Sequence, residues 1–409
     1  MINLQSEMAG NSASGIGAAS AERLLADVRG LAPSITARRA EIETARRMPL
    51  DLVEALRSIG IFRMTVPRSH GGLELDLRAV LDVLAALGRI DGSVAWIAMI
   101  AAGIAAIMTM RPREVYDRIY QDGPDVIFAG VAVPGGTARP AGGGWCVTGR
   151  WPFASGCQHA DSILAFCVMT RDGIPLPGPA PGVPLVQSFY LPANQWQIED
   201  TWYAAGLKGT GSHHVALNNV LIPAENFGDV VGGAPCVPGP LYHGGMMQHL
   251  PAFCLAAVSL GMAEGALDEI VQLAQTGRTQ VRAARPMRDS EMFQGELGRV
   301  EAELRAARAY LEVQAAIHWR RALAGTLADD PRLKQQASQV GIWVTDTSVG
   351  AADACFALAG GSAVYESSPL QHRLRDLHVA AQNSFGQQRH YAEAGKLLLN
   401  LFPSSSSDA

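Results

Sequence analysis

The order of three differently composed regions constrains the fold of this chain more than any other feature. Two regions, from about residue 20 to 120 and from about 241 to 402, carry apolar residues three and four positions apart with charged residues between them, which is the pattern of amphipathic helices. The region between them, 121–235, is rich in Gly and Pro and alternates β-forming residues with turn residues. With 409 residues, the chain exceeds one ordinary core, so we expect two or three domains.

These regions predict an α+β fold with an N-terminal helical domain at 21–120, a central β-barrel or sandwich at 121–235 and a C-terminal four-helix bundle at 236–402. The ends, 1–20 and 403–409, are expected to be disordered tails. Pro49 at a helix start and Gly60 at its end are typical helix boundaries in the first domain.

One segment, Val94–Met110, carries no charge and could be taken for a membrane span. It is rich in Ala and at the short limit for crossing a bilayer, and Ser93 before it is a candidate N-cap. We therefore expect a buried core helix. The N-terminus lacks a basic segment followed by a long apolar core, so we expect no signal peptide and a cytoplasmic protein with no membrane partner.

Composition excludes several classes of protein. Hydrophobic residues make up 48% and charged residues 17%, which rules out a disordered chain and favours surface buried between subunits. A net charge of −5 gives no reason to expect nucleic acid as a partner. Neither a CxxC pair nor an HExxH motif is present, so we expect no metal site. The sequence also lacks a P-loop, a GxGxxG opening a βαβ unit and a GxSxG elbow.

The stretch "GRWPFASGCQHADSILAF", residues 149–166, interrupts an expected strand with Trp-Pro-Phe-Ala-Ser-Gly. Because Pro and Gly weaken a strand ladder, they belong at edges, bulges or places of close backbone approach. We infer that a flat, apolar group lies against this strand, with the hydroxyl of Ser155 directed at it.

Four stretches in this order give the chain a family resemblance: "GRWPFASGCQHAD", "TWYAAGLKGTGSHHVALNNVLIP", "FQGELGRVEAELRAARAYL" and "GGSAVYESSPLQHRLRDLHVAAQ". Over about residues 20 to 400 the chain resembles the acyl-CoA dehydrogenase fold, and within it the group D, two-component flavin-dependent monooxygenases. The resemblance implies an enzyme that inserts one oxygen atom of O2 into a small, largely apolar, aromatic or N- or S-containing substrate through a C4a-hydroperoxyflavin. A separate NAD(P)H:flavin reductase would supply FADH2 or FMNH2.

The resemblance also implies which residues meet the flavin. Phe153 takes the aromatic position and Ser155 the hydroxyl position near flavin N5, as a catalytic residue, and Gly156 lets the backbone approach the ring. The other implied cofactor contacts are Pro134 at the pyrimidine edge, Trp202 beside the flavin, Arg282 at a phosphate (with Arg278 and Arg285 as competitors) and Gln294 near it, and Gly360, Gly361 and Arg375 reaching the cofactor of a neighbouring subunit. The last three imply a homotetramer.

The chain departs from the family pattern at its acid–base residues. The two glutamate positions of acyl-CoA dehydrogenases fall near Ser384 and Pro251, so α-proton abstraction lacks its base. The two histidine positions of many group D enzymes fall near Ile104 and at Asn383, so we expect Asn383 to orient substrate or a water.

The substrate pocket should therefore be apolar. Its candidate lining residues are Trp96, Ile100, Ile104 and His249, for each of which an ordinary core or interface position is the alternative. Two other functions stay open at this point: a flavin dehydrogenase or oxidase with a displaced base, and a flavin-free homologue that only binds.

Overall fold

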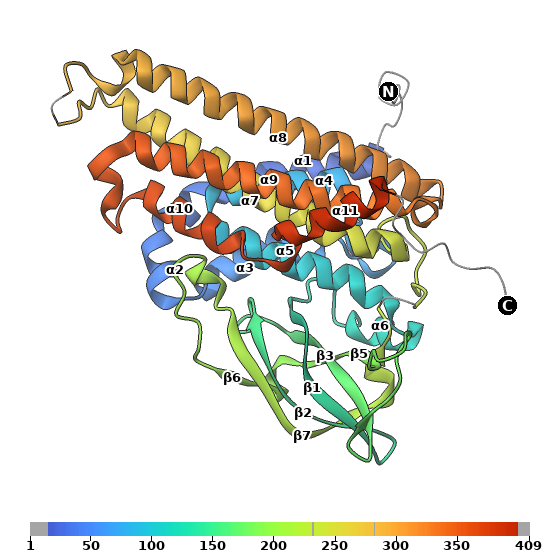
Figure 1. Cartoon of the computed structure of the whole chain (residues 1–409). Coiled ribbons are helices and arrows are strands. Elements are labelled where there is room, and N and C mark those ends of the chain that lie inside the picture. The colour runs from blue at the N-terminus through green and yellow to red at the C-terminus, as the bar shows by residue number, and fades with distance from the viewer. Residues whose placement is uncertain (1–14, 231–232, 282, 400–409) are drawn as a thin grey trace.

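The computed structural model describes residues 15–230, 233–281 and 283–399. Two sets of helices lie together above a β-domain (Figure 1). The N-terminal helices are α1 Gly15–Ala37, α2 Arg39–Ala45, α3 Leu50–Ile59, α4 Leu77–Ile90, α5 Gly92–Ile107 and α6 Arg113–Ile119. The C-terminal helices are α7 Gly244–Gln275, α8 Glu291–Leu323, α9 Pro331–Ala359, α10 Pro369–Ala380 and α11 Tyr391–Leu398. One hydrophobic core joins the two sets.

Among the described residues, two helices are long and apolar enough to cross a membrane, namely α5 with its continuation to Met110 and α7. In each of them, 83% of the apolar 18-residue window is buried inside the protein. Helix α5 packs against α4 and α7 on one side and against the β-domain on the other (Figure 1). The expectation of a core helix at Val94–Met110 is confirmed.

Two details of the sequence prediction are wrong. The N-cap of α5 is Asp91, whose carboxylate accepts from the amides of Ser93 and Val94, and not Ser93. A carboxylate two residues earlier reaches both amides, so the helix begins before Ser93. In addition, α1 begins at Gly15, so residues 15–20 of the expected tail are helical. The remaining tail positions, 1–14 and 403–409, lie outside the described residues.

The β-domain is one sheet in the order β6-β7-β2-β1-β3-β5-β8, with β4 beside β3. All its ladders are antiparallel except β1 with β3. The strands are β1 Phe128–Ala141, β2 Gly144–Ala154, β3 Ser162–Arg171, β4 Ile174–Pro175, β5 Val186–Pro192, β6 Gln197–Glu199, β7 His213–Pro223 and β8 Phe227–Gly228.

The sheet curls around its own core. Trp145 of β2 and Phe227 of β8 have ring centroids 6.1 Å apart, although their strands are four steps apart in the sheet order. A flat sheet would separate these strands by about 19 Å. Two irregularities of register in β1, on either side of Pro134, allow the bend. The curl matches the barrel-like shape that we expected, although the order of the described strands leaves β6 and β8 as edges rather than closing a barrel.

A buried cluster of charges ties α2, α5 and α10 together. The His372 ring lies 3.2 Å from Glu43, 3.1 Å from Asp376 and 3.6 Å from Asp91. Burial by itself would lower the pKa of His372, but Asp376, Asp91 and Glu43 outweigh it and raise the pKa to about 10. The cluster therefore holds an imidazolium in the core.

We predict that the free energy of unfolding decreases as the pH rises from about 6.5 towards 10. His372 binds its proton more tightly in the folded state than its ordinary pKa of 6.5 allows in the unfolded chain, so its contribution is complete below 6.5 and is lost above it. Burial lowers the pKa of His159 to about 4 and of His249 to about 3, so their contribution has the opposite sign and is lost as the pH falls below 6.5.

Urea denaturation at a series of pH values between 5 and 9 measures this dependence. Stability should be greatest near pH 6.5, and His372→Gln should flatten the alkaline limb. A wild-type stability that stays constant or rises between pH 7 and 9 would contradict the charge assignment of the cluster.

Candidate active site

The Trp-Pro-Phe-Ala-Ser-Gly stretch forms a bulge at the end of β2. The register with β7 shifts between Trp151 and Ala154, and Phe153 has a φ of 65°, a conformation that a side chain with a Cβ rarely adopts. The amide of Ser155 closes the bend by donating to the carbonyl of Phe153 at 2.9 Å. The side chain of Phe153 is 61% exposed. A strained residue that presents an aromatic ring to the surface indicates a functional position.

Two rings stand edge-on to Phe153, namely Trp202 at 6.3 Å and His214 at 6.4 Å between centroids. The indole of Trp202 is fixed by its bond to the carbonyl of Leu207 at 3.1 Å. The amides of Thr201 and Trp202 both donate to Nδ1 of His213, at 3.1 and 3.2 Å. This nitrogen must therefore stay unprotonated, in agreement with burial lowering the pKa of His213. His213 thus shapes the turn that carries Trp202.

Behind Phe153, Ser155 lies in a buried hydrogen-bond network. The indole Nε1 of Trp96, on α5, donates to Ser155 Oγ at 3.2 Å. On the other side, Ser155 Oγ is 2.7 Å from Ser212 Oγ, and Ser212 Oγ is 2.7 Å from Thr210 Oγ1. The hydroxyl therefore has a fixed position between helix α5 and the segment that leads into β7.

Gly156 completes this part of the site. Its φ is 77°, and a Cβ there would lie 3.2 Å from Cγ2 of Ile97. Its amide donates to the carbonyl of Thr210 at 2.8 Å. Only glycine combines this backbone conformation with the close approach of α5. An exposed aromatic surface and a buried, fixed hydroxyl thus stand next to each other on one short segment, which fits a flat ring with a polar edge.

Comparison with known proteins shows the family of this chain. The models of the acyl-CoA dehydrogenase N-terminal and C-terminal domains match residues 20–112 and 253–388. Indole-3-acetate monooxygenase of Pseudomonas putida is 31% identical over 370 residues, which is 90% of this chain and 91% of that protein. The chain belongs to the flavin-dependent monooxygenases of the acyl-CoA dehydrogenase fold.

Two further matches support this assignment. The oxygenase subunit HsaA of Mycobacterium tuberculosis is 27% identical over 88% of this chain and 90% of its own length. XiaF from Streptomyces sp., solved in complex with FADH2 and glycerol, has a TM-score of 0.86 and 25% identity, and the match covers 96% of this chain and 98% of that one. The predicted fold, enzyme class and reduced-flavin cofactor are confirmed. Membership decides against the dehydrogenase and flavin-free alternatives.

Helix α5 carries three of the four predicted substrate residues of this monooxygenase. Trp96 and Ile104 are buried and Ile100 is half-buried. Trp96 reaches Ser155 through its indole, and Ile104 packs against Gly130 of β1. The structure thus brings Trp96 to the candidate flavin residues. Contact of any of the three with substrate stays a prediction.

His249 lies in the bundle, where its ring meets His318 edge-on at 5.1 Å. Its Nδ1 is buried and has no hydrogen-bond partner among the described residues. Burial, and then the neighbouring His318, lower its pKa to about 3, so it is neutral and a weak base.

Asn383 caps the short helix Ser384–Gly386, because its Oδ1 accepts from the amide of Phe385 at 3.0 Å. Contact of its side-chain NH2 group with substrate or a water stays a prediction.

The predicted phosphate contacts remain untested. Arg282 lies outside the described residues. Gln294 is exposed and donates to the carbonyl of Arg288 at 2.7 Å. Gly360, with a φ of 62°, ends α9, and Gly361 beside it is exposed. The guanidinium of Arg375 donates to groups of its own chain, namely Gln371, the carbonyl of Ala205 and Glu43.

Pro134 is exposed and lies between the two register shifts of β1. The two residues after it are glycines because the chain packs closely against a side chain there. A Cβ on Gly135 or Gly136 would lie 2.8 or 2.6 Å from the indole of Trp151. The sequence analysis did not recognise that the indole of Trp151 leaves no room for a larger residue at these two positions. It also missed Thr210, Ser212 and His213, although "GTGSHH" was among the family stretches.

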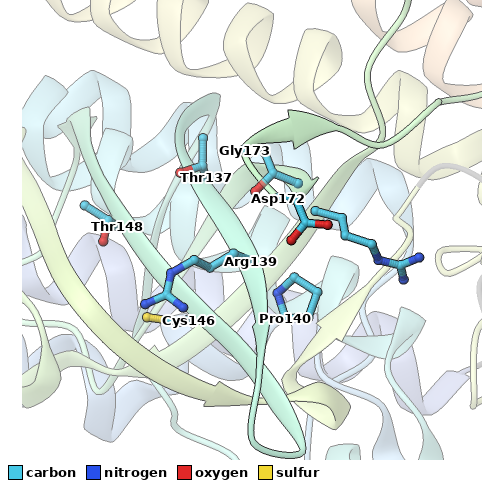
Figure 2. Close-up of a pocket in the computed structure, with 9 residues that line it drawn as sticks. Thr137, Arg139, Pro140, Cys146, Thr148, Asp172 and Gly173 are labelled. Atoms are coloured by element: carbon cyan, nitrogen blue, oxygen red, sulfur yellow. The ribbon is translucent and has the colours of Figure 1, made fainter.

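A surface pocket of about 520 Å³ lies elsewhere, over β1, β2 and β3 (Figure 2). Its lining includes Arg139, Cys146 and Asp172. None of the predicted flavin or substrate residues lines it. The pocket is therefore distinct from the candidate active site.

Phe153→Gly should lower flavin affinity roughly tenfold without lowering stability. Glycine accepts a φ of 65° without strain, while the aromatic surface is lost. Urea denaturation and flavin titration measure the two effects. Asn219→Gly, at another positive φ in the same sheet, is the control for strain relief alone. A destabilised Phe153→Gly variant with unchanged flavin affinity would assign Phe153 to packing instead.

Proposed function

We propose that this protein is the oxygenase component of a two-component aromatic hydroxylase. It inserts one oxygen atom of O2 into a small, largely apolar aromatic substrate, with an N or S heteroatom as a further option for the site of oxidation. A separate NAD(P)H:flavin reductase supplies FADH2 or FMNH2. The observation that carries the proposal is the exposed, bulged Phe153 directly beside the buried hydroxyl of Ser155.

Each residue type in the site has a task in this reaction. Phe153 and Trp202 offer aromatic surface to the flavin ring, and Gly156 allows the backbone to come close. Ser155 holds a hydrogen bond at the ring edge near N5. Helix α5, with Trp96 buried against Ser155, keeps water from that edge. The reduced flavin supplies the activation of O2.

The relatives and the candidate apolar lining support the proposed substrate class. The name of indole-3-acetate monooxygenase gives an indole as the substrate of that relative. A second relative, the FADH2-dependent resorcinol hydroxylase of Rhizobium sp., is named for a phenol. It is 31% identical over 61% of either chain. The candidate lining residues of α5, Trp96, Ile100 and Ile104, carry no charge, which favours a flat and largely apolar molecule. A homotetramer and a cytoplasmic location complete the proposal as predictions.

Reconstitution tests the proposed function. The purified protein is supplied with NADH, a flavin reductase and FAD or FMN, and challenged with indole, phenol and resorcinol. We expect a hydroxylated product that depends on both the reductase and this protein. Oxidation of NADH with only hydrogen peroxide as product across aromatic and heteroatom substrates would reject the proposal.

Ser155→Ala should fold and lower the ratio of hydroxylated product to hydrogen peroxide roughly tenfold or more. Loss of one hydrogen bond with a buried partner costs about 1–3 kcal/mol, which corresponds to that change in rate. Product and peroxide are measured per NADH consumed. Trp96→Phe is the matched control, because it removes the Trp96–Ser155 bond and keeps the hydroxyl. Equal leakage in both variants would place the effect in the bond to Trp96 and not at the flavin.

The hydroxylation rate should depend weakly on pH between about 6 and 8, because asparagine at position 383 does not titrate. Asn383→His should introduce a limb near the ordinary histidine pKa. Asn383→Asp, which keeps an oxygen to cap the short helix, separates loss of the cap from the new titration. A steep wild-type limb near pH 6.5 would show that a histidine elsewhere carries the proton.

A further inference from the structure

Three hydroxyls form a continuous chain that ends on a carbonyl. Ser155 Oγ is 2.7 Å from Ser212 Oγ, Ser212 Oγ is 2.7 Å from Thr210 Oγ1, and Thr210 Oγ1 is 2.8 Å from the carbonyl oxygen of Leu207. All three hydroxyl residues are buried, with at most 5% of their surface exposed. Solvent therefore does not compete for these bonds.

The carbonyl at the end fixes the direction of every bond in the chain. A carbonyl oxygen can only accept, so at 2.8 Å the Thr210 hydroxyl must donate to it. Having one hydrogen, Thr210 must accept from Ser212. Ser212 has then used its own hydrogen, so it must accept from Ser155. The chain is polarised from Ser155 to Leu207.

This polarity leaves Ser155 with one defined function. Its hydrogen is directed to Ser212, and one of its two lone pairs accepts from the indole of Trp96. The group that remains free on Ser155 Oγ is a lone pair. Ser155 therefore offers an acceptor and not a donor to whatever lies beside it.

We propose that Ser212 and Thr210 are positioning residues that make Ser155 an acceptor, and that this selects reduced over oxidised flavin. The inference rests on the proposed function, in which Ser155 meets flavin N5. In reduced flavin N5 carries a hydrogen and donates, whereas in oxidised flavin N5 is a bare acceptor. An acceptor on Ser155 pairs with the first and repels the second.

The end of the chain is anchored so that the polarity persists. The amide of Leu207 donates to Asp376 at 2.6 Å, and its carbonyl also receives the Thr210 amide and the Trp202 indole, both at 3.1 Å. The carbonyl is thus held by several donors and cannot turn away from Thr210. It also stays satisfied if the Thr210 hydroxyl is removed.

Thr210→Val tests the proposal, because valine has the same shape without the hydroxyl. Ser212 then loses its acceptor and can donate to Ser155. Both lone pairs of Ser155 are then occupied, by Ser212 and Trp96, so its hydrogen points outward. We expect the ratio of the dissociation constants for oxidised and reduced flavin to fall roughly tenfold or more. FAD and FMN, oxidised or photoreduced under anaerobic conditions, are the probes, and the readout is binding without turnover.

Thr109→Val is the matched control. Thr109 is also buried and also donates to the carbonyl three residues earlier, Ala106, at 2.7 Å, but it belongs to no hydroxyl chain that leads to Ser155. Thr210→Ser retains the hydroxyl and should restore the wild-type ratio. Ser212→Ala, which frees the Ser155 hydrogen to point either way, should give a ratio between those of wild type and Thr210→Val.

The possible results distinguish a failure of the proposed role of Thr210 and Ser212 from a failure of the proposed flavin-dependent function. A ratio that falls in Thr210→Val, holds in Thr109→Val and returns in Thr210→Ser supports the inference. Equal ratios in Thr210→Val and Thr109→Val overturn the inference and leave the proposed function standing. A wild-type protein that binds neither redox state of FAD or FMN overturns both.

Discussion

The rest of the site depends on the contact between α10 and the segment before β7. The amide of Leu207 donates to the buried carboxylate of Asp376, and a Cβ on Gly206 would lie 2.3 Å from the carbonyl oxygen of Arg375. The backbone of this segment is thus pressed onto the helix, and Leu207 is forced to a φ of 49°. The same Leu207 carbonyl then holds Trp202 and Thr210. Through one residue, the bundle fixes both the aromatic surface and the polar chain of the candidate flavin site.

Arg375 takes part in this contact from within its own chain. Its guanidinium donates to Glu43, to Gln371 and to the carbonyl of Ala205, at 2.8, 2.9 and 2.8 Å. Arg375 and Asp376 thus hold the segment 205–207 at its two ends, Ala205 and Leu207. The resemblance assigned Arg375 to a neighbouring subunit's cofactor, and these three bonds use three of its five N–H donors. That assignment stays a prediction, whereas the role in holding the segment is visible in the geometry.

Periodic patterns along the chain predicted the helical and β regions, whereas contacts between residues far apart in the sequence could not be predicted. Apolar periodicity gave the order of helical, β and helical regions, because each element needs one buried face. The sequence prediction named Ser93 as the N-cap where the structure has Asp91, because either side chain can cap. The family stretches located Phe153 and Ser155, but the link of Ser155 to Ser212 spans 57 residues and depends on the bulge that local propensity does not encode. His249 likewise carries no local signal that its ring faces His318.

In the candidate site, the direction of the hydrogen bonds among the hydroxyls is set by the geometry of their partners and not by the protonation state of a titrating group. By the family resemblance, the two histidine positions of many group D enzymes fall near Ile104 and at Asn383, and His249 is held neutral by burial. The hydroxyls of Ser155, Ser212 and Thr210 do not ionise near neutral pH, so no proton equilibrium reverses their polarity. Their direction depends only on a carbonyl that a buried carboxylate keeps in place through the Leu207 amide. If Ser155 meets the flavin as we propose, it presents the same acceptor over the whole pH range in which the fold persists.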